Sequence, residues 1–321
     1  MNYKKYMTYR AELGFPRQDF IDAGDLDLYG KFPQIEPVEG LPGHKNGNIH
    51  RCHLVEDFLR FFRLDVDKKL VAFSEGVRHS VEKLMEHYVD RKWIIAADNY
   101  PFYLETADDL ELEYDVFTTL EEGSLSALAS LETDGDILLT TYPLKPSGAK
   151  YTDADIDWLK QWLAEDAQRL LIIDAVYIHY FETAQAIMGL FKESEQVVIL
   201  YSLSKSFAAP KIAGFTFTHQ PEIRELFKGL PRNDYTMTLC YGLLNSMEGI
   251  KRRDDVLNLL KEKREAAVKR HLLEYGRADE GYLFYVDKSW DELNNRGIMS
   301  VPASVYGSNA PGVIISTLSI L

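Results

Sequence analysis

Lys205 is the residue of this chain whose setting most clearly suggests chemistry. It lies in the segment 201–207, Tyr-Ser-Leu-Ser-Lys-Ser-Phe, directly after the apolar run 197–200. Such a run is typical of a buried strand, so the lysine is expected where the strand passes into a loop. A lysine amine that is shielded from water there can attack an aldehyde and form an imine.

A carboxylate and a phenol follow a second apolar run. Asp174 comes directly after residues 170–173, Leu-Leu-Ile-Ile, and Tyr177 follows in the pattern Asp-x-x-Tyr. An acid next to a buried cation keeps both groups charged. Together, Lys205, Asp174 and Tyr177 resemble the active site of an enzyme that uses pyridoxal 5'-phosphate (PLP).

Further segments resemble the class I and II branch of the fold type I aminotransferase family. Residues 202–205 match its Ser-x-Ser-Lys motif, and 98–103, Asp-Asn-Tyr-Pro-Phe-Tyr, resemble its aromatic-Pro-x-aromatic segment. Residues 142–148 and 297–307 resemble two more family elements, and the resemblance runs from about residue 48 to the chain end. It implies an α/β fold, with a mainly parallel sheet in a large domain and a small α+β C-terminal domain.

The resemblance also implies how PLP is held. Lys205 would form the imine, Asp174 would pair with the pyridinium, Tyr177 would contact the ring oxygen and Tyr100 would stack on the ring. The phosphate would lie at a helix start, where backbone N–H groups bind anions. The further cofactor-binding candidates are Gly76, Val77, Arg78, Lys145, Ser202, Ser204 and Lys211. No metal is expected, because the spacing of His50, Cys52 and His53 fits no zinc motif.

Three departures from the family pattern concern the cofactor and the substrate. Lys145 stands where the family has an asparagine that donates to the ring oxygen, and a cation there would favour the ionised oxygen. The phosphate-binding arginine after the lysine is missing, with Lys211 as the nearest cation. The arginine that binds the substrate carboxylate is also missing, with Ile315 or Ser316 at its place. The substrate therefore lacks a free α-carboxylate, or another arginine binds it, with Arg17, Arg78 and Arg296 as candidates.

Alternating strands and helices must position these residues. The sequence predicts strands at 70–74, 92–97, 111–117, 136–142, 169–174, 196–201 and 214–218, and helices at 76–89, 124–131, 153–165 and 182–191. This alternation is typical of a mainly parallel sheet. One or two long helices are expected over 234–275, followed by strands at 281–286, 298–301 and 313–318. We expect a large domain at 48–233, and a small domain formed by 1–47 and 234–321.

Composition narrows the functional classes. The chain has 321 residues and a net charge of −14, which argues against a nucleic-acid partner because phosphate binding needs a basic surface. It has only two cysteines, which fits a reducing cytoplasm. The N-terminal residues are polar, and no apolar run approaches the roughly 20 residues of a membrane helix. The family resemblance implies a homodimer.

The implied reaction is transamination between an amine or amino-acid substrate and a keto acceptor. The substrate amine would displace Lys205, and the freed lysine would move the proton at the substrate α-carbon while Asp174 keeps the ring protonated. A PLP-dependent decarboxylase, lyase or cyclising enzyme on the same fold is an alternative, because the sequence does not show which α-carbon bond breaks. A non-catalytic binding protein that kept the fold is another.

Overall fold

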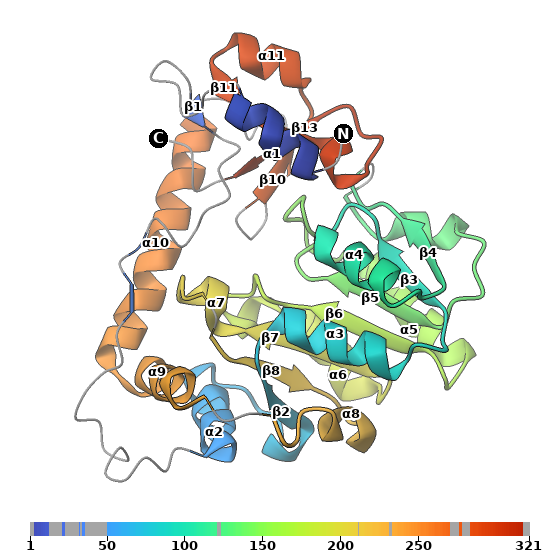
Figure 1. Cartoon of the computed structure of the whole chain (residues 1–321), viewed down its shortest axis with the longest axis vertical. Coiled ribbons are helices and arrows are strands. Elements are labelled where there is room, and N and C mark those ends of the chain that lie inside the picture. The colour runs from blue at the N-terminus through green and yellow to red at the C-terminus, as the bar shows by residue number, and fades with distance from the viewer. Residues whose placement is uncertain are drawn as a thin grey trace. The chain divides into compact units, whose positions relative to one another are not determined.

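The computed structural model describes residues 3–12, 21–22, 32, 34–35, 50–120, 123–210, 212–230, 233–269, 276–277 and 283–316. The chain divides into two compact units (Figure 1). Unit 1 comprises Met1–Asp27, Asp90–Gln161 and Asn258–Leu321, and unit 2 comprises Leu28–Val89 and Trp162–Leu257. The largest sheet has the strand order β2-β8-β7-β6-β5-β3-β4, of which the first four strands belong to unit 2.

The strands of unit 2 bring the carboxylate and the lysine to one edge. Strands β6 (Leu170–Asp174) and β7 (Val197–Ser202) are parallel, with Asp174 opposite Leu200. Strand β8 (Gly214–Phe217) is antiparallel both to β7 and to β2 (Val71–Ser74). Every residue of β6 and β7 is buried, as expected for strands covered on both faces.

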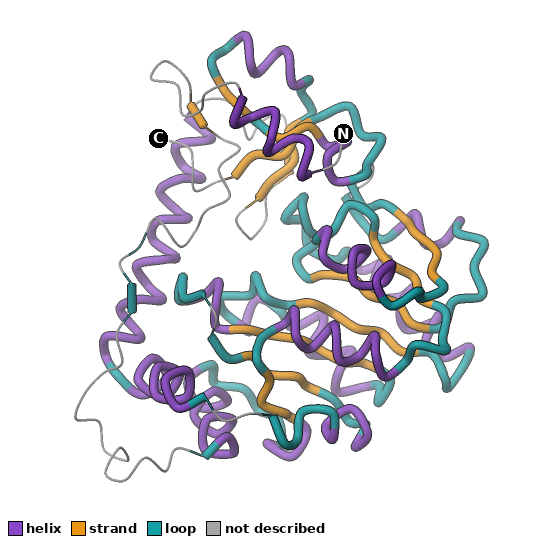
Figure 2. Tube along the Cα trace, in the orientation of Figure 1, coloured by secondary structure: helices purple, strands orange, loops and turns teal. Residues whose placement is uncertain are grey.

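Helices cover this part of the sheet with apolar side chains. Helices α3 (Val77–His87) and α6 (Gln185–Glu193) contact β7, and α2 (Arg51–Phe61) contacts β2. Phe58 of α2 stacks on Phe215 of β8 with ring centroids 3.9 Å apart. Figure 2 shows α3 and α2 as helices beside the strands. The remaining helices here are the short α7 (Leu203–Ser206) and α8 (Pro221–Glu225), then α9 (Asp234–Asn245) and the first part of α10 (Met247–Lys269).

Unit 1 contains the other three strands of the large sheet. Strand β3 (Trp93–Ala96) is parallel to both β4 (Tyr114–Phe117) and β5 (Ile137–Thr141). Helix α4 (Pro101–Asp109) begins after β3, and α5 (Asp153–Glu165) follows β5. Thr152 and Asp155 cap α5 reciprocally: the Thr152 amide donates to the Asp155 carboxylate (2.7 Å), and the Asp155 amide donates to the Thr152 hydroxyl (3.1 Å).

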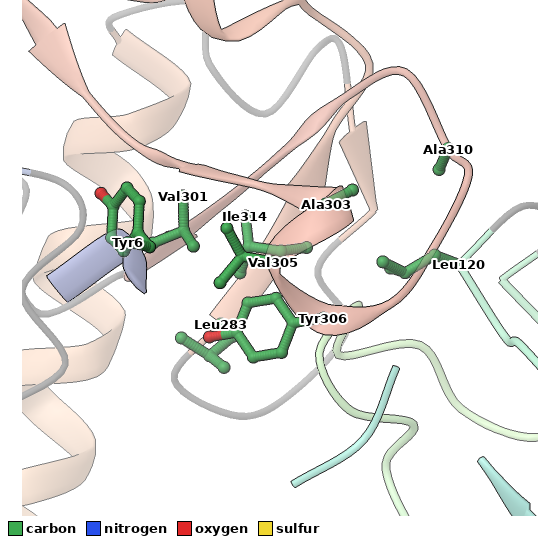
Figure 3. Packing of buried hydrophobic residues seen from close by; sticks show 9 residues of the cluster. All are labelled: Tyr6, Leu120, Leu283, Val301, Ala303, Val305, Tyr306, Ala310 and Ile314. Carbon is green, nitrogen blue, oxygen red and sulfur yellow. The ribbon is translucent and has the colours of Figure 1, made fainter. Parts of the chain in front are cut away.

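The C-terminal part of unit 1 forms smaller sheets. In one of them the strand order is β12 (Val301–Pro302), β13 (Val313–Ser316), β10 (Leu283–Val286), β9 (Gly276–Arg277). In the other, β1 (Ile21–Asp22) pairs with β11 (Ile298–Met299). Ile314 of β13 packs with Tyr6 of α1 (Tyr3–Glu12) and Tyr306 in a buried cluster (Figure 3). Helix α11 (Trp290–Asn295) follows β10.

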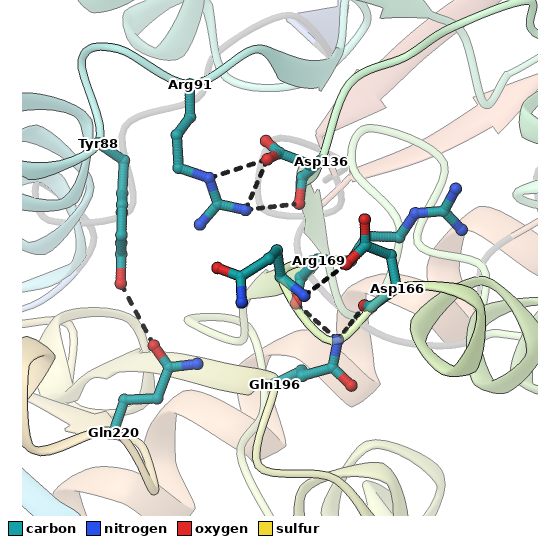
Figure 4. Close-up of polar contacts among 8 residues, drawn as sticks. Tyr88, Arg91, Asp136, Asp166, Arg169, Gln196 and Gln220 are labelled. Carbon is teal, nitrogen blue, oxygen red and sulfur yellow. Dashed lines mark hydrogen bonds and ion pairs between the residues drawn. The ribbon is translucent and has the colours of Figure 1, made fainter.

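Polar contacts fasten the segments that precede several strands, within each unit (Figure 4). In unit 1, Arg91 Nε before β3 donates to Asp136 Oδ2 before β5 (3.0 Å). In unit 2, Gln196 Nε2 before β7 donates to the carbonyls of Asp166 (2.7 Å) and Arg169 (2.9 Å), which precede β6. These contacts hold together the amino-terminal ends of the strands in each unit.

The predicted α/β fold with a mainly parallel sheet is confirmed, and so are all seven strands predicted for the large sheet. The predicted helix at 124–131 is instead a 3-10 helix at Ser126–Ser130. Helices α1, α4, α7, α8 and α11 were not predicted. Lys205, expected where a strand passes into a loop, lies in the short helix α7 instead. The expected domains at 48–233 and at 1–47 with 234–321 differ from the two contact-based units and stay a prediction. Among the described residues, no helix is long and apolar enough to cross a membrane.

Candidate active site

Lys205 lies in the short helix α7, directly after the buried strand β7 (Figure 1). Ser202 caps this helix: its Oγ accepts from the Ser204 amide (3.2 Å) and donates to the Ala213 carbonyl (3.3 Å). Lys205 is half-buried, and its Nζ lies 5.9 Å from the centre of the Tyr177 ring. Lys205 and Tyr177, which the sequence predicts to bind the cofactor, therefore lie close together in the structure.

Asp174 ends β6 and is buried, with only 4% of its surface exposed. Its Oδ1 accepts from the Val176 amide at 3.0 Å, which turns the chain sharply after the strand. The Ala175 amide donates to the Leu200 carbonyl of β7 (2.8 Å), so this turn is joined to the strand that carries the lysine. A carboxylate at this strand end can balance a positive charge that is brought to the site.

A hydrogen-bond network that the sequence analysis missed joins the turn after Asp174 to helix α7. The Tyr201 hydroxyl donates to the Ile178 carbonyl (3.0 Å) and lies 2.7 Å from Ser206 Oγ. Ser206 Oγ also donates to the Ile178 carbonyl (3.1 Å). Tyr201 is fully buried, and this burial raises the pKa of its phenol above the usual value. The only sequence signal is that Tyr201 and Ser206 flank the Ser-x-Ser-Lys motif.

Four small residues form a tight corner around the start of α3. Gly76 caps this helix with φ of +111°, and a Cβ on it would lie 3.8 Å from Ser202 Oγ. Gly214 is in register with both Ser74 and Ser202, and a Cβ on it would lie 2.7 Å from Gly76 Cα and 2.8 Å from Ser74 Oγ. Ser74 Oγ is buried and has no hydrogen-bond partner among the described residues. This corner can accept an anion with a hydroxyl and backbone N–H groups at a helix N-terminus.

The remaining phosphate candidates differ in how far their side chains are exposed. Val77, the first residue of α3, is buried, whereas the Arg78 side chain that follows is exposed. Ser204 is half-buried in α7 beside Lys205. Lys211 lies outside the described residues.

Unit 1 brings Tyr100 and Lys145 together. Tyr100 follows β3 and caps α4, while Lys145 follows β5, where its amide donates to Thr141 Oγ1 (2.8 Å). Lys145 Nζ lies 4.2 Å from the centre of the Tyr100 ring, a close cation–π contact. Both side chains are half-buried. The aromatic segment and the lysine that replaces the family asparagine are thus neighbours.

The last strand offers no guanidinium for a carboxylate. Ile315 of β13 packs in a buried apolar cluster with Phe284 and Leu293. Ser316 is buried as well, and its Oγ has no hydrogen-bond partner among the described residues. Of the alternative arginines, Arg296 is exposed after α11, and Arg17 lies outside the described residues. The part of the chain that the structure describes contains no cluster of His, Cys, Asp and Glu suited to a metal ion.

Comparison with known proteins bears on the family and the fold of the chain. The family model for aminotransferase class I and II matches residues 44–266, more than half of the chain. Aspartate aminotransferase from Thermotoga maritima is 14% identical, with a TM-score of 0.73 over 98% of this chain and 92% of that chain. Aromatic aminotransferase from Pyrococcus horikoshii is 18% identical, with a TM-score of 0.69 over 97% and 94%. Identities this low show the fold alone. No curated protein matches the sequence.

Proposed function

The chain belongs to the aminotransferase class I and II family, and we propose that it moves an amino group between an amine or amino-acid substrate and a keto acceptor, with Lys205 as the residue that holds and serves the cofactor. Members of this family use PLP. The observation that carries the proposal is the common sheet edge of unit 2, where Asp174 ends β6 and Lys205 follows the parallel strand β7.

The residues of unit 2 fit PLP. Ser74 Oγ is a buried donor without a partner among the described residues, and Gly214, which has no Cβ, lets this hydroxyl and Gly76 at the start of α3 come close together, where they would bind a phosphate. Ser202 and Ser204 would supply further donors, and Val77 and Arg78 open the helix above the corner. Asp174 would balance a protonated pyridine nitrogen, Tyr177 would donate to the ring oxygen, and Lys205 Nζ would hold the cofactor as a Schiff base. Lys211 is a further candidate for the phosphate.

The cofactor, when bound, supplies the electron sink that stabilises negative charge on the substrate α-carbon. The chain itself supplies proton transfer and orientation. The Lys205 amine, when free, would accept the α-proton of the substrate as a general base and return a proton as a general acid. Asp174 stays ionised and keeps a positive charge on its partner nitrogen. Tyr100 would form the platform for the ring, with Lys145 as a charged donor near the ring oxygen.

The substrate class follows from β13. An α-carboxylate is ordinarily bound by a guanidinium through paired hydrogen bonds, and here Ile315 packs into a core cluster instead. We therefore propose an amine without a free α-carboxylate as the amino donor, in a specialised biosynthetic reaction. The same feature favours a decarboxylase, lyase or cyclising enzyme as the second candidate, because these need not hold the carboxylate in the same way. A non-catalytic binding protein with this fold is the remaining alternative.

One experiment separates these functions. The purified protein with PLP is incubated with a set of amines and α-amino acids, with and without a keto-acid acceptor, and the carbonyl product of the donor, the new amino acid and the CO2 released are quantified. Transamination yields the carbonyl product and the new amino acid in equal amounts and only when the acceptor is present. Decarboxylation releases CO2 and elimination gives a carbonyl product, both without acceptor, and a binding protein gives none of the three.

We also propose that the protein is a homodimer in a reducing cytoplasm and has no nucleic-acid partner. The family resemblance supports a homodimer, the two cysteines support a reducing cytoplasm, and the charge of −14 argues against a nucleic-acid partner. Sedimentation velocity at several protein concentrations tests the dimer. A single monomeric species at micromolar concentration would contradict it.

A further inference from the structure

The backbone that follows Lys205 adopts an uncommon conformation. Ala208 has φ of +46°, in the left-handed region that non-glycine residues seldom occupy. Its amide donates back to the Lys205 carbonyl (3.3 Å), and the Ala209 amide donates to the Ser204 carbonyl (2.9 Å). The amides of this turn are thus joined directly to the lysine and its neighbour. A rotation of the turn would carry Lys205 with it.

Arg252 binds the same turn from helix α10. Its Nε donates to the Phe207 carbonyl (2.9 Å) and its Nη2 donates to the Ala208 carbonyl (3.2 Å). The planar guanidinium therefore bridges two consecutive carbonyls with two different nitrogens, and its rigid fork fixes the geometry of both bonds, which a flexible lysine ammonium would not. The Phe32 ring lies 4.7 Å from Arg252 Cζ, on the face of the guanidinium. Arg252 is half-buried, and this burial lowers the pKa of its guanidinium from the usual value without removing its charge at neutral pH.

The neighbouring arginine shows that this arrangement is particular to Arg252. The Arg253 guanidinium lies 4.9 Å from the rings of Phe61 and Tyr180 and bonds to the Asp254 carboxylate (3.2 Å). Of these two arginines, only Arg252 donates hydrogen bonds to the turn that follows Lys205.

We propose that Arg252 is a positioning residue for Lys205. It fixes the carbonyls of Phe207 and Ala208, which holds the left-handed turn at Ala208 and thereby the direction in which Lys205 Nζ is presented. The inference rests on the proposed function, in which Lys205 holds PLP. It concerns a residue 47 positions further along the chain, on a different helix.

Arg224 provides a matched control. Its Nη1 donates to the carbonyls of Thr218 and His219, both at 2.9 Å, so it also bridges two consecutive carbonyls just after a strand. It contacts neither α7 nor the turn after it in these hydrogen bonds. Replacing Arg224 removes the same kind of contact, and any loss of general stability should be similar.

The test compares Arg252→Met with Arg224→Met in the full chain titrated with PLP. Three quantities are measured: PLP affinity, the pH midpoint of the visible band, and the visible circular dichroism of the bound cofactor. We expect Arg252→Met to weaken PLP binding about tenfold, as for the loss of one charge-assisted hydrogen bond. The band midpoint should also shift and the dichroic band shrink. Arg224→Met should keep all three at wild-type values even if its melting temperature falls. Arg252→Lys, which retains the positive charge and one donor group, should recover part of the affinity.

Equal behaviour of Arg252→Met and Arg224→Met in all three cofactor measurements would overturn the inference and leave Arg252 a structural residue. If Arg252→Met does not fold, Arg252→Lys and Arg224→Lys are compared by the same criteria. Failure of the proposed function gives a different result: the wild type itself would show no visible band with PLP. The inference about Arg252 would then fail as well.

Discussion

Lys145 Nζ lies 4.2 Å from the centre of the Tyr100 ring, so the lysine that replaces the family asparagine contacts the aromatic residue assigned to the cofactor platform. The segment around Lys145 is well fastened. The Leu144 amide donates to the Ala149 carbonyl and the Gly148 amide donates to the Leu144 carbonyl, both at 2.7 Å. The lysine is therefore a defined feature of unit 1, and it places a positive charge beside Tyr100 that an asparagine would not.

Removing the charge of Lys145 should raise the pH midpoint of the visible band. The family resemblance implies that Lys145 would lie near the linkage between Lys205 and PLP. A cation there would disfavour protonation of that linkage, so its loss in Lys145→Met is expected to raise the midpoint by about one pH unit. Lys145→Asn should give a similar rise but bind PLP more tightly than Lys145→Met, because asparagine retains a donor. Spectrophotometric pH titration measures the midpoint. Lys150→Met serves as the control, and a Lys145→Met midpoint equal to that of Lys150→Met contradicts the assigned position of Lys145.

A side chain at Gly214 should disrupt the corner around Gly76. The added Cβ in Gly214→Ala would lie 2.6 Å from the Tyr201 carbonyl oxygen and 2.7 Å from Gly76 Cα, so backbone atoms must move. We expect a loss of roughly 1–3 kcal/mol in the free energy of unfolding and weaker PLP binding. Urea denaturation and PLP titration measure the two effects.

Gly189 in α6 is the control for this substitution. A Cβ there meets no atom within 4 Å, so Gly189→Ala should stabilise the protein by about 0.5–1 kcal/mol through helix propensity. If Gly214→Ala keeps the stability and the PLP affinity of the wild type, the steric clash expected around Gly214 is contradicted.

Replacing Tyr201 should change how stability depends on pH. At pH 7, Tyr201→Phe loses the hydrogen bonds to Ile178 and Ser206 and should cost about 1 kcal/mol. Burial raises the pKa of Tyr201 in the folded state, so above about pH 10 only the unfolded chain releases this proton. The wild type then loses up to about 1.4 kcal/mol per pH unit relative to Tyr201→Phe. The difference between the two proteins should shrink and then reverse.

Urea denaturation at pH 7, 9, 10 and 11 follows this crossing. Ser206→Ala is the control, because it removes one partner of the phenol but leaves the ionisable group in place. It should lose stability with rising pH at least as steeply as the wild type. A constant difference between wild type and Tyr201→Phe across this range would mean that the phenol is accessible to water.

The absence of an arginine from β13 predicts a preference among substrates. For matched pairs of an amine and the α-amino acid with the same side chain, we expect the amine to have the higher kcat/KM, because a buried Ile315 offers the carboxylate no partner. Steady-state assays with a keto-acid acceptor measure this ratio. Efficient turnover of aspartate or alanine would contradict the preference and point to another residue that binds the carboxylate.

The sequence predicted the parts of this fold whose signals are local. Apolar runs predicted β6 and β7, because this signal is read from adjacent residues. Helix α1 was missed, since much of what fixes it is distant, such as the hydrogen bond from the Tyr6 hydroxyl to the Ser300 carbonyl (2.7 Å).

In the candidate site, too, some features can be predicted from neighbouring residues and others depend on distant contacts. The motif around Lys205 and the acid at Asp174 are readable from the sequence, since each follows an apolar strand. The corner of Ser74, Gly76 and Gly214 depends on strand register, and the role of Arg252 depends on a contact between distant segments. Neither leaves a pattern in neighbouring residues, and both required the structure.

The central claim is that Lys205 holds PLP, and an absorbance spectrum tests it most directly. Purified wild type and Lys205→Ala are each mixed with PLP, passed through a desalting column and scanned in the visible range, with circular dichroism to show that both are folded. We expect a visible band in the wild type that shifts with pH and survives desalting, and no such band in Lys205→Ala. A wild type without a band, or a Lys205→Ala variant that keeps it, would contradict the assignment of Lys205.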